Sequence, residues 1–186
     1  MQRYQSTLAI VINKKQYKEK DIITTLLTPR LGKITVLAKG AQSINSTRLG
    51  SLQLGNIIKI QIYTKNDFTW LSESQTLESF LVKDKKLVQL NLLFYFLELI
   101  NRLIADNQQI DGVYSISEKI IKAINRSDLV GYLKYEIELI KILGFGLPNE
   151  IENNFLKGDY KMTQTYIKRF FESIVEKPLE SNKLFK

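Results

Sequence analysis

The sequence predicts an α+β protein in which a small five-stranded β-domain over residues 1–80 precedes an α-helical domain over residues 81–186. Up to about Glu78, apolar and polar residues alternate in short runs, which is typical of half-buried strands. After Phe80, apolar residues recur at spacings of three and four, which is typical of amphipathic helices. The composition is 44% hydrophobic and 25% charged over 186 residues, so the chain is globular and long enough to bury a core.

Five short runs carry the strand pattern, at residues 8–12, 22–26, 34–38, 58–65 and 68–73. The fourth is the clearest, because Ile58, Ile60 and Ile62 share one face of the expected strand. A polar insertion at residues 41–55 separates the third run from the fourth and has room for one helical turn. This order predicts a small closed β-barrel of the OB type, and a three-on-two sandwich fits the same periodicity.

Helices are expected at residues 87–106, from Ser115 or Ser117 to Asn125, from Asp128 to Gly144, and at residues 166–174, where Pro178 ends the last helix. The first is apolar nearly all round, as in a buried helix of a bundle. It contains Glu98 and Arg102, which disfavour a membrane-spanning helix, so we expect a cytoplasmic protein. Packing of this domain is expected to centre on Leu93, Phe94, Leu97, Ile137, Ile140 and Phe170.

The chain contains no cysteine and no histidine. Disulfides, cysteine nucleophiles, thiolate zinc sites and Ser-His-Asp triads are therefore excluded. Glu136 and Glu138 lie two residues apart on one expected helix, so they diverge by about 200° and cannot share a metal ion. Glu150 and Glu152 are expected at the solvated edge of a loop. We therefore expect no catalytic residue, no cofactor and no metal, and hence no enzyme.

Basic residues are concentrated in the first domain. The whole chain has 27 Lys and Arg against 19 Asp and Glu, a net charge of +8. Residues 1–80 contain 11 basic and 5 acidic residues, an excess of +6, whereas residues 81–186 contain 16 and 14, an excess of +2. A basic domain of this kind indicates a polyanionic partner, although a Lys-rich composition is also compatible with a simple solvated surface.

Strand alternation refines this prediction. Lys33 and Lys39 are expected on the outward face of the third strand, and Tyr63 on the outward face of the fourth, where it could stack on a base. Phe68 and Trp70 are expected in the core. The predicted nucleic-acid-binding residues are Lys14, Lys15, Lys18, Arg30, Lys33, Lys39, Arg48, Lys59 and Tyr63.

A series of short motifs runs through the chain. Glu19-x-Asp21 precedes Leu26-Leu27-Thr28-Pro29 and Leu31-Gly32-Lys33, which are followed by Ala38-Lys39-Gly40-Ala41, Ser46 and Leu52-Gln53. A weaker set in the second half comprises Leu143-Gly144-Phe145, Pro148 and Ser181-Asn182-Lys183-Leu184. In this order and spacing the motifs resemble the RecO family of bacterial recombination mediators, and Ala-Lys-Gly-Ala is the most specific of them.

The resemblance implies an OB-fold domain that binds single- and double-stranded DNA and anneals complementary strands. It also implies contact with the acidic C-terminal tail of the single-strand-binding protein. With a RecR-like protein, such a chain would help to load the RecA recombinase in recombinational DNA repair, without catalysing a reaction. Lys122, Arg126, Lys134 and Lys141 are candidates for the tail contact by charge alone.

The chain departs from the family pattern in three places, one of which is Leu54-Gly55 where Pro-Phe usually follows Leu-Gln. Gln42-Ser43 stands where two Arg residues are usual, and residues 149–162 carry no cysteine where many members have a zinc motif. Zinc is therefore not implied. Two alternatives from other classes remain open, namely an OB-fold interaction scaffold that does not bind DNA and a divergent carboxylate nuclease.

Overall fold

The computed structural model describes residues 3–43, 46, 48–66, 68–80, 85–175 and 179–181. Contacts within the chain group it into two units. The barrel unit comprises Met1–Lys85 and Ile104–Gln109, and the helical unit comprises Lys86–Leu103 and Ile110–Lys186. The domain boundary between residues 80 and 81 stays a prediction. Pro178 and residues 182–184 lie outside the described residues.

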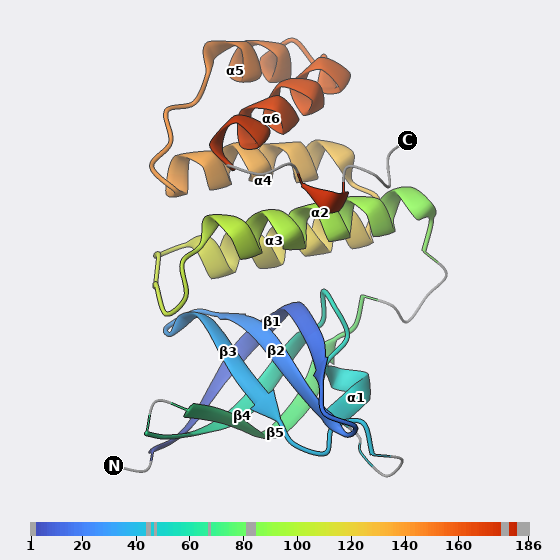
Figure 1. The fold of residues 1–186 in the computed structure, drawn as a ribbon. Coiled ribbons are helices and arrows are strands. Elements are labelled where there is room, and N and C mark those ends of the chain that lie inside the picture. Colours follow the sequence, from blue (N-terminus) through green and yellow to red (C-terminus); the bar gives the residue numbers. More distant parts are fainter. Residues whose placement is uncertain are drawn as a thin grey trace. The chain divides into compact units, whose positions relative to one another are not determined.

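The barrel unit contains β1 (Arg3–Tyr17), β2 (Asp21–Thr28), β3 (Gly32–Ala38), α1 (Arg48–Ser51), β4 (Ile57–Lys65) and β5 (Phe68–Glu78), as Figure 1 shows. The strands close into a barrel in the order β1-β2-β3-β5-β4. Neighbouring strands are antiparallel except β3 and β5, which pair in parallel through Leu37 and Trp70. The OB-type barrel is confirmed, and the sandwich alternative is wrong.

Alternating side chains fill the barrel as the sequence predicts. The buried cluster comprises Ala9, Val11, Ile22, Leu26, Ile34, Val36, Ala38, Ala41, Leu52, Ile58, Ile60, Ile62 and Leu71. A register shift between Val11 and Asn13 interrupts the alternation of β1, so that Ile10, Val11 and Ile12 are all buried.

Hydrogen bonds of the Asn56 side chain connect α1 to the residues that follow β5. Its amide nitrogen donates hydrogen bonds to the carbonyl oxygens of Gly50 and Ser51 at 3.2 and 3.1 Å. Its Oδ1 accepts from the Phe80 backbone N–H at 3.2 Å and from the Ser79 hydroxyl at 3.1 Å. Because Asn56 is fully buried, these bonds meet the hydrogen-bonding requirement of a side chain that would otherwise be costly to bury.

A short segment from between two helices belongs to the barrel unit. Asn107 donates its backbone N–H to the carbonyl of Lys33 at 2.7 Å, and Lys33 Nζ lies 3.0 Å from Asp106 Oδ1. Ile104–Gln109 therefore covers the outward side of Lys33, which is only 7% exposed. The expectation that Lys33 faces solvent is wrong, because a segment distant in sequence lies over its strand.

The close packing of Ile104–Gln109 also accounts for the glycine at position 32. Gly32 has φ = 65°, and a Cβ at this position would collide with the backbone carbonyl of Gln108. Only glycine tolerates both the left-handed conformation and this close approach. The Gly-Lys pair at the start of β3 is thus tied to the packing of Ile104–Gln109.

The helical unit contains α2 (Leu87–Leu103), α3 (Val113–Asn125), α4 (Leu129–Ile142), α5 (Asn149–Leu156) and α6 (Tyr160–Ile174). Within the part of the chain that the structure describes, no helix is both long and apolar enough to cross a membrane. α5 was not predicted, and it places Glu150 and Glu152 in the first turn of a helix rather than in a loop. Ile151 between them is 1% exposed, and half-buried Phe155 contacts the ring of Tyr160, so the helix packs through its apolar side chains.

Two of the helix starts differ from expectation. Gly112, with φ = 84° and no side-chain cap, precedes α3, so that Ser115 and Ser117 lie inside the helix. α6 starts six residues earlier than predicted, after Asp159, whose Oδ1 accepts from the Met162 N–H at 3.0 Å. The predicted cap of α4 is confirmed, because Asp128 Oδ1 accepts from the Gly131 N–H at 2.9 Å.

Apolar packing holds the helical unit together. Leu93, Leu97, Ile137 and Ile140 are buried as predicted. Phe94 is 36% exposed and Phe170 is only half-buried, whereas Phe171 is fully buried. The inward face of α6 is formed by Thr163, Ile167 and Phe171 at spacings of four, which shifts the core position by one residue from the expected Phe170.

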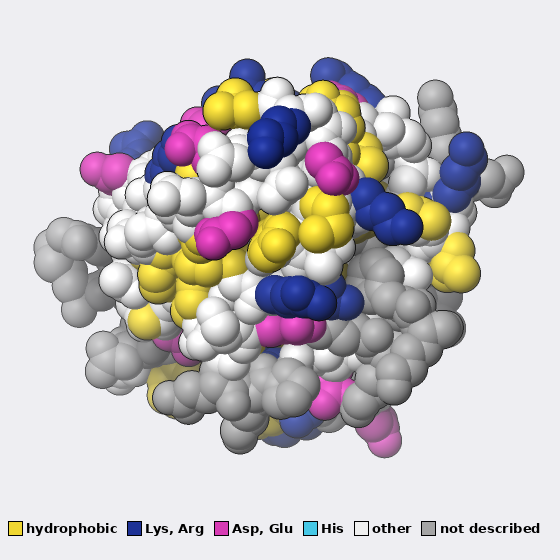
Figure 2. Space-filling view, turned by 90° about the horizontal axis from the view of Figure 1, so that it is seen from above, with side chains coloured by type: hydrophobic (Ala, Val, Ile, Leu, Met, Phe, Trp, Pro, Cys, Tyr) yellow, Lys and Arg dark blue, Asp and Glu magenta, His cyan; other side chains and the backbone are white. Residues whose placement is uncertain are grey.

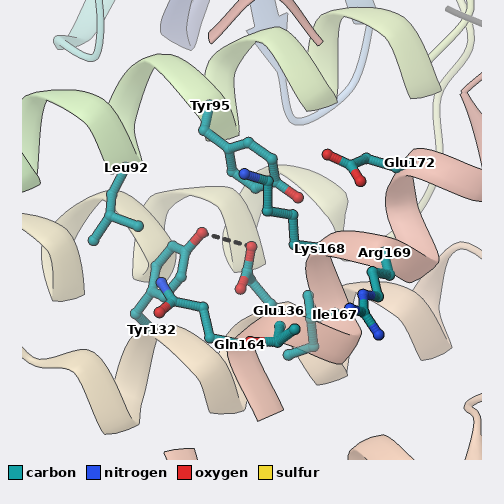
Figure 3. Close-up of a pocket in the computed structure, with 10 residues that line it drawn as sticks. Leu92, Tyr95, Tyr132, Glu136, Gln164, Ile167, Lys168, Arg169 and Glu172 are labelled. Atoms are coloured by element: carbon teal, nitrogen blue, oxygen red, sulfur yellow. Dashed lines mark hydrogen bonds between the residues drawn. The ribbon is translucent and has the colours of Figure 1, made fainter. Parts of the chain in front are cut away.

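A carboxyl group is buried in this unit. Glu136 is 1% exposed, and its Oε1 accepts a hydrogen bond from the Tyr132 hydroxyl at 2.6 Å. Both side chains line a cavity of about 360 Å³ together with Tyr95 of α2 and Lys168 and Glu172 of α6 (Figure 3). Burial raises the pKa of Glu136 to about 8, although the bond from Tyr132 opposes the shift.

Reversing the charge of Lys33 tests the covering segment. Lys33→Glu places a second carboxylate against Asp106 in a buried position, so we expect the free energy of unfolding to fall by roughly 1–3 kcal/mol. Thermal and denaturant unfolding measure it. The double variant Lys33→Glu/Asp106→Lys should recover part of the loss, and Arg30→Glu in the exposed neighbouring turn should have little effect. Equal effects of Lys33→Glu and Arg30→Glu would contradict the packing described.

Buried Glu136 makes stability depend on pH. In the unfolded chain this carboxyl ionises near its ordinary pKa of 4.5, whereas in the folded chain it stays protonated up to about pH 8. Between these values the folded state binds more protons, so its contribution to stability is lost as the pH rises. Glu136→Gln keeps an acceptor for Tyr132 and should be more stable than the wild type by roughly 2–4 kcal/mol at pH 8.

The difference in the free energy of unfolding between Glu136→Gln and the wild type should shrink toward zero as the pH falls to about 4.5. Glu138→Gln on the same helix is the matched control, because it removes a carboxyl that is only partly buried. Denaturant unfolding at several pH values gives the result. Parallel curves for Glu136→Gln and the wild type from pH 5 to 9 would show that Glu136 is ionised in the folded protein.

Candidate nucleic-acid interface

A line of outward side chains crosses the barrel from strand to strand. Tyr4 of β1 pairs with Tyr63 of β4, and Tyr63 pairs with Trp70 of β5. Trp70 pairs with Leu37 of β3, where the barrel closes. Through β2 the line continues from Leu37 to Ile23 and then to Lys15 of β1. The line therefore passes through every strand and returns to β1 at Lys15, well along the strand from Tyr4, so it winds around the outside of the barrel.

Three aromatic rings, those of Tyr4, Tyr63 and Trp70, lie on this line, and Phe68, two residues before Trp70 on β5, extends the row; we call these four rings the aromatic band. The ring centroids of Tyr4 and Tyr63 are 4.9 Å apart, those of Tyr63 and Trp70 5.6 Å, and those of Trp70 and Phe68 6.1 Å. Neighbouring planes are tilted by 39°, 33° and 33° in the same order. Tyr4 is 68% and Phe68 70% exposed, whereas Tyr63 and Trp70 are half-buried.

The positions of Phe68 and Trp70 follow from the strand pattern of β5. A register shift occurs where Gln61 pairs with Glu73 but the next residue, Ile62, pairs with Leu71. Leu71 is buried in the core, and Phe68 and Trp70 lie on the outside of the barrel. The expectation that these two aromatics belong to the core is therefore wrong.

Lysines flank the aromatic band at one end of the barrel. Lys39 is exposed, and its Nζ lies 5.9 Å from the centroid of the Trp70 ring. Lys15 and Lys18 are exposed on β1 and on the turn that follows it. This turn is joined to the segment after β3, because the Lys20 carbonyl accepts from the Gln42 N–H at 3.0 Å. Lys15, Lys18, Lys39 and Tyr63 are thus predicted residues that the structure gathers at one end.

The other predicted residues are placed differently. Lys14 donates to Gln53 Oε1 at 2.7 Å, and partial burial lowers its pKa. Arg48 is half-buried and donates to the Leu71 carbonyl at 3.5 Å. Arg30 is exposed in the turn between β2 and β3, at the end of these strands opposite to the β1–β2 turn. Lys59 is exposed beside Glu73 in a shallow hollow. Arg30, Arg48, Lys59 and the buried Lys33 thus lie apart from this end, whereas Lys14 is next to Lys15 on β1 but directs its side chain to Gln53. A role for any of the nine predicted residues in binding nucleic acid stays a prediction.

The helical unit shows a different distribution of charge. Basic and acidic side chains are interspersed with apolar ones on the face seen from above the helices (Figure 2). Of the cations proposed for the tail contact, Lys122 lies 2.6 Å from Glu118 and Lys141 lies 3.4 Å from Glu152. Arg126 and Lys134 are exposed.

Metal binding finds no support among the residues whose positions are described. No group of three Asp or Glu side chains in that part of the chain is arranged to hold an ion. Glu136 is directed toward Tyr132, whereas Glu138 lies 4.0 Å from Lys119. The two carboxylates point to different surroundings, so they do not form the metal site that a nuclease of this kind would need.

Comparisons with known proteins agree with this architecture. The family model described as Recombination protein O N terminal matches residues 1–80, and the one described as Recombination protein O C terminal matches residues 85–149. The DNA repair protein RecO of Thermoanaerobacter sp. (strain X514) is 25% identical over 146 residues, which are 77% of this chain and 59% of that protein. The RecO proteins of Roseiflexus sp. (strain RS-1) and Rhodopirellula baltica are 26% and 28% identical over 77% and 74% of this chain.

The chain spans only 51–59% of the length of these three relatives. The two family models nevertheless cover both the barrel and most of the helices, in the order in which they occur here. Together with the closed OB-type barrel, these matches show that the chain belongs to the RecO family of DNA repair proteins.

Proposed function

We propose that this chain binds single- and double-stranded DNA through the barrel unit and anneals complementary strands. It would act in the cytoplasm as a RecO-like mediator that helps to load the RecA recombinase in recombinational repair, and it would not be an enzyme. One observation carries the proposal. Exposed lysines gather at one end of an OB-type barrel in a chain that belongs to a family of DNA repair proteins.

Strand annealing requires only a protein surface that neutralises phosphates. Lysine ammonium groups neutralise phosphates and release counterions whatever the base sequence, so two complementary strands can be held close together. Lys15, Lys18 and Lys39 meet this requirement because their side chains are exposed. A surface of this kind needs no nucleophile, base or metal ion.

A second candidate, an OB-fold scaffold that does not bind DNA, is favoured by a specific observation. Lys14, Lys33 and Arg48 each contact another part of the barrel unit, so they are less available to phosphates than the sequence suggests. Fewer exposed cations would weaken binding of a polyanion. A direct binding measurement distinguishes the two functions.

Reversing two exposed charges tests the DNA-binding surface. Lys15→Glu with Lys39→Glu should weaken binding to single strands of every sequence alike, because lysines that bind phosphates read no sequence information. Since two phosphates would no longer be neutralised, the slope of log affinity against log salt should become shallower by about 1.4. Anisotropy of labelled oligonucleotides at several salt concentrations measures both effects.

The matched control reverses Lys134 and Lys161, two exposed lysines of the helical unit. This double variant changes the net charge by the same amount as Lys15→Glu with Lys39→Glu, and it should leave the slope of log affinity against log salt unchanged. Equal reductions in affinity from both double variants would indicate diffuse binding. No binding by the wild-type protein at low salt would favour the scaffold.

The family membership also motivates a prediction about partners. We expect micromolar or tighter binding to the acidic C-terminal tail of the single-strand-binding protein and to a RecR-like protein. Co-sedimentation with the purified partners measures this, and a tail peptide lacking its acidic residues serves as the control. If neither partner binds at micromolar concentrations, the mediator function fails even where DNA binding persists.

A further inference from the structure

We propose that the aromatic band is a stacking surface for unpaired bases, so that this face of the barrel selects single-stranded over double-stranded nucleic acid. The inference deepens the proposed function and rests on it. It concerns Tyr4, Tyr63, Trp70 and Phe68, of which only Tyr63 was expected to face outward.

Exposure is the first argument. Large aromatic side chains stabilise a fold when they are buried, yet Tyr4 is 68% and Phe68 70% exposed at the two ends of the aromatic band. Each has an aromatic neighbour within about 6 Å that packs against one side of it. The rings are therefore fixed by cross-strand neighbours while much of their surface remains accessible to a ligand.

Arrangement is the second argument. Tyr4, Tyr63 and Trp70 are consecutive cross-strand partners, so the rings follow one another across β1, β4 and β5. Their planes are tilted by 33–39° and do not stack face to face on one another. Successive bases of a flexible strand could each meet one ring, because every base offers a flat π-face whatever its identity.

Charge identifies the occupant as a nucleic acid. Lys39 Nζ lies 5.9 Å from the Trp70 centroid, which places a cation where the backbone of a stacked strand would run. Lys65, exposed at the end of β4, pairs across the strands with Phe68. Lysines at both sides of an aromatic row suit a ligand that alternates flat bases with phosphates. An apolar protein partner would instead have to bury these charges.

Duplex DNA cannot use the aromatic band in this way. Its bases are paired and stacked on one another, so only phosphates and groove edges are accessible. The lysines can contact phosphates of either form, whereas the aromatic rings add affinity for unpaired bases alone. Preference for single strands therefore follows from the band, and salt-dependent affinity for both forms follows from the lysines.

Trp70 is the only tryptophan of the chain, so its fluorescence reports directly on the aromatic band. We expect an unlabelled oligothymidine to quench Trp70 emission, and a duplex of the same length to bind with much less quenching. Anisotropy of a labelled strand measures binding independently. The variant Tyr4→Ala/Phe68→Ala removes only exposed rings and retains Trp70 as the reporter. Its affinity for single strands should fall roughly 10- to 100-fold, with an unchanged salt slope and unchanged duplex affinity.

Leu77→Ala is the matched control, because Leu77 is also exposed on β5, at 49%, but lies outside the aromatic band. It should bind single strands as the wild type does. If anisotropy shows binding of the wild type while Trp70 emission and the Tyr4→Ala/Phe68→Ala affinity stay unchanged, DNA binding stands and the aromatic band does not stack bases. If the wild type binds no oligonucleotide at all, the proposed function fails and this inference fails with it.

Discussion

Closure of the barrel between β3 and β5 is the constraint on which the candidate interface depends. This parallel pairing, through Leu37 and Trp70, joins two strands that are not neighbours in the sequence. It removes the free edges of the sheet and brings the start of β5 beside the end of β3. Lys39 and Trp70 thereby become neighbours, and the row that begins at Tyr4 ends beside a cation. Without closure, Lys39 and Trp70 would lie at opposite edges of the sheet.

Much of the barrel could be predicted from local periodicity. The alternation around Ile58, Ile60 and Ile62 placed Tyr63 correctly on the outside, because side-chain direction within a strand depends only on parity. Tyr4 was not identified, since its pairing with Tyr63 is a matter of register between strands far apart in the sequence. Phe68 was missed for another reason. Its position was inferred from the usual burial of aromatic residues, whereas its parity, opposite to that of buried Leu71, places it on the outside.

Lys33 shows a further limit of sequence-based prediction. Its parity is outward as expected, but Ile104–Gln109 lies over it and Asp106 accepts its charge. No pattern near Lys33 indicates which distant segment will cover it. Glu136 is a comparable case in the helical unit, where a carboxyl in an otherwise ordinary amphipathic helix becomes fully buried beside Tyr132. In both cases tertiary packing decides whether a charged residue is available to a ligand.

The central claim is that nucleic acid lies along the aromatic band and its flanking lysines. Photo-crosslinking of a single strand containing 5-iodouracil, followed by mass spectrometry of the digested protein, tests it most directly. Cross-links are expected on peptides that contain Tyr4, Tyr63 or Phe68, with excess unlabelled single strand abolishing them. Cross-links confined to peptides of the helical unit, within Lys86–Leu103 or beyond Ile110, would contradict the assignment of DNA binding to the barrel.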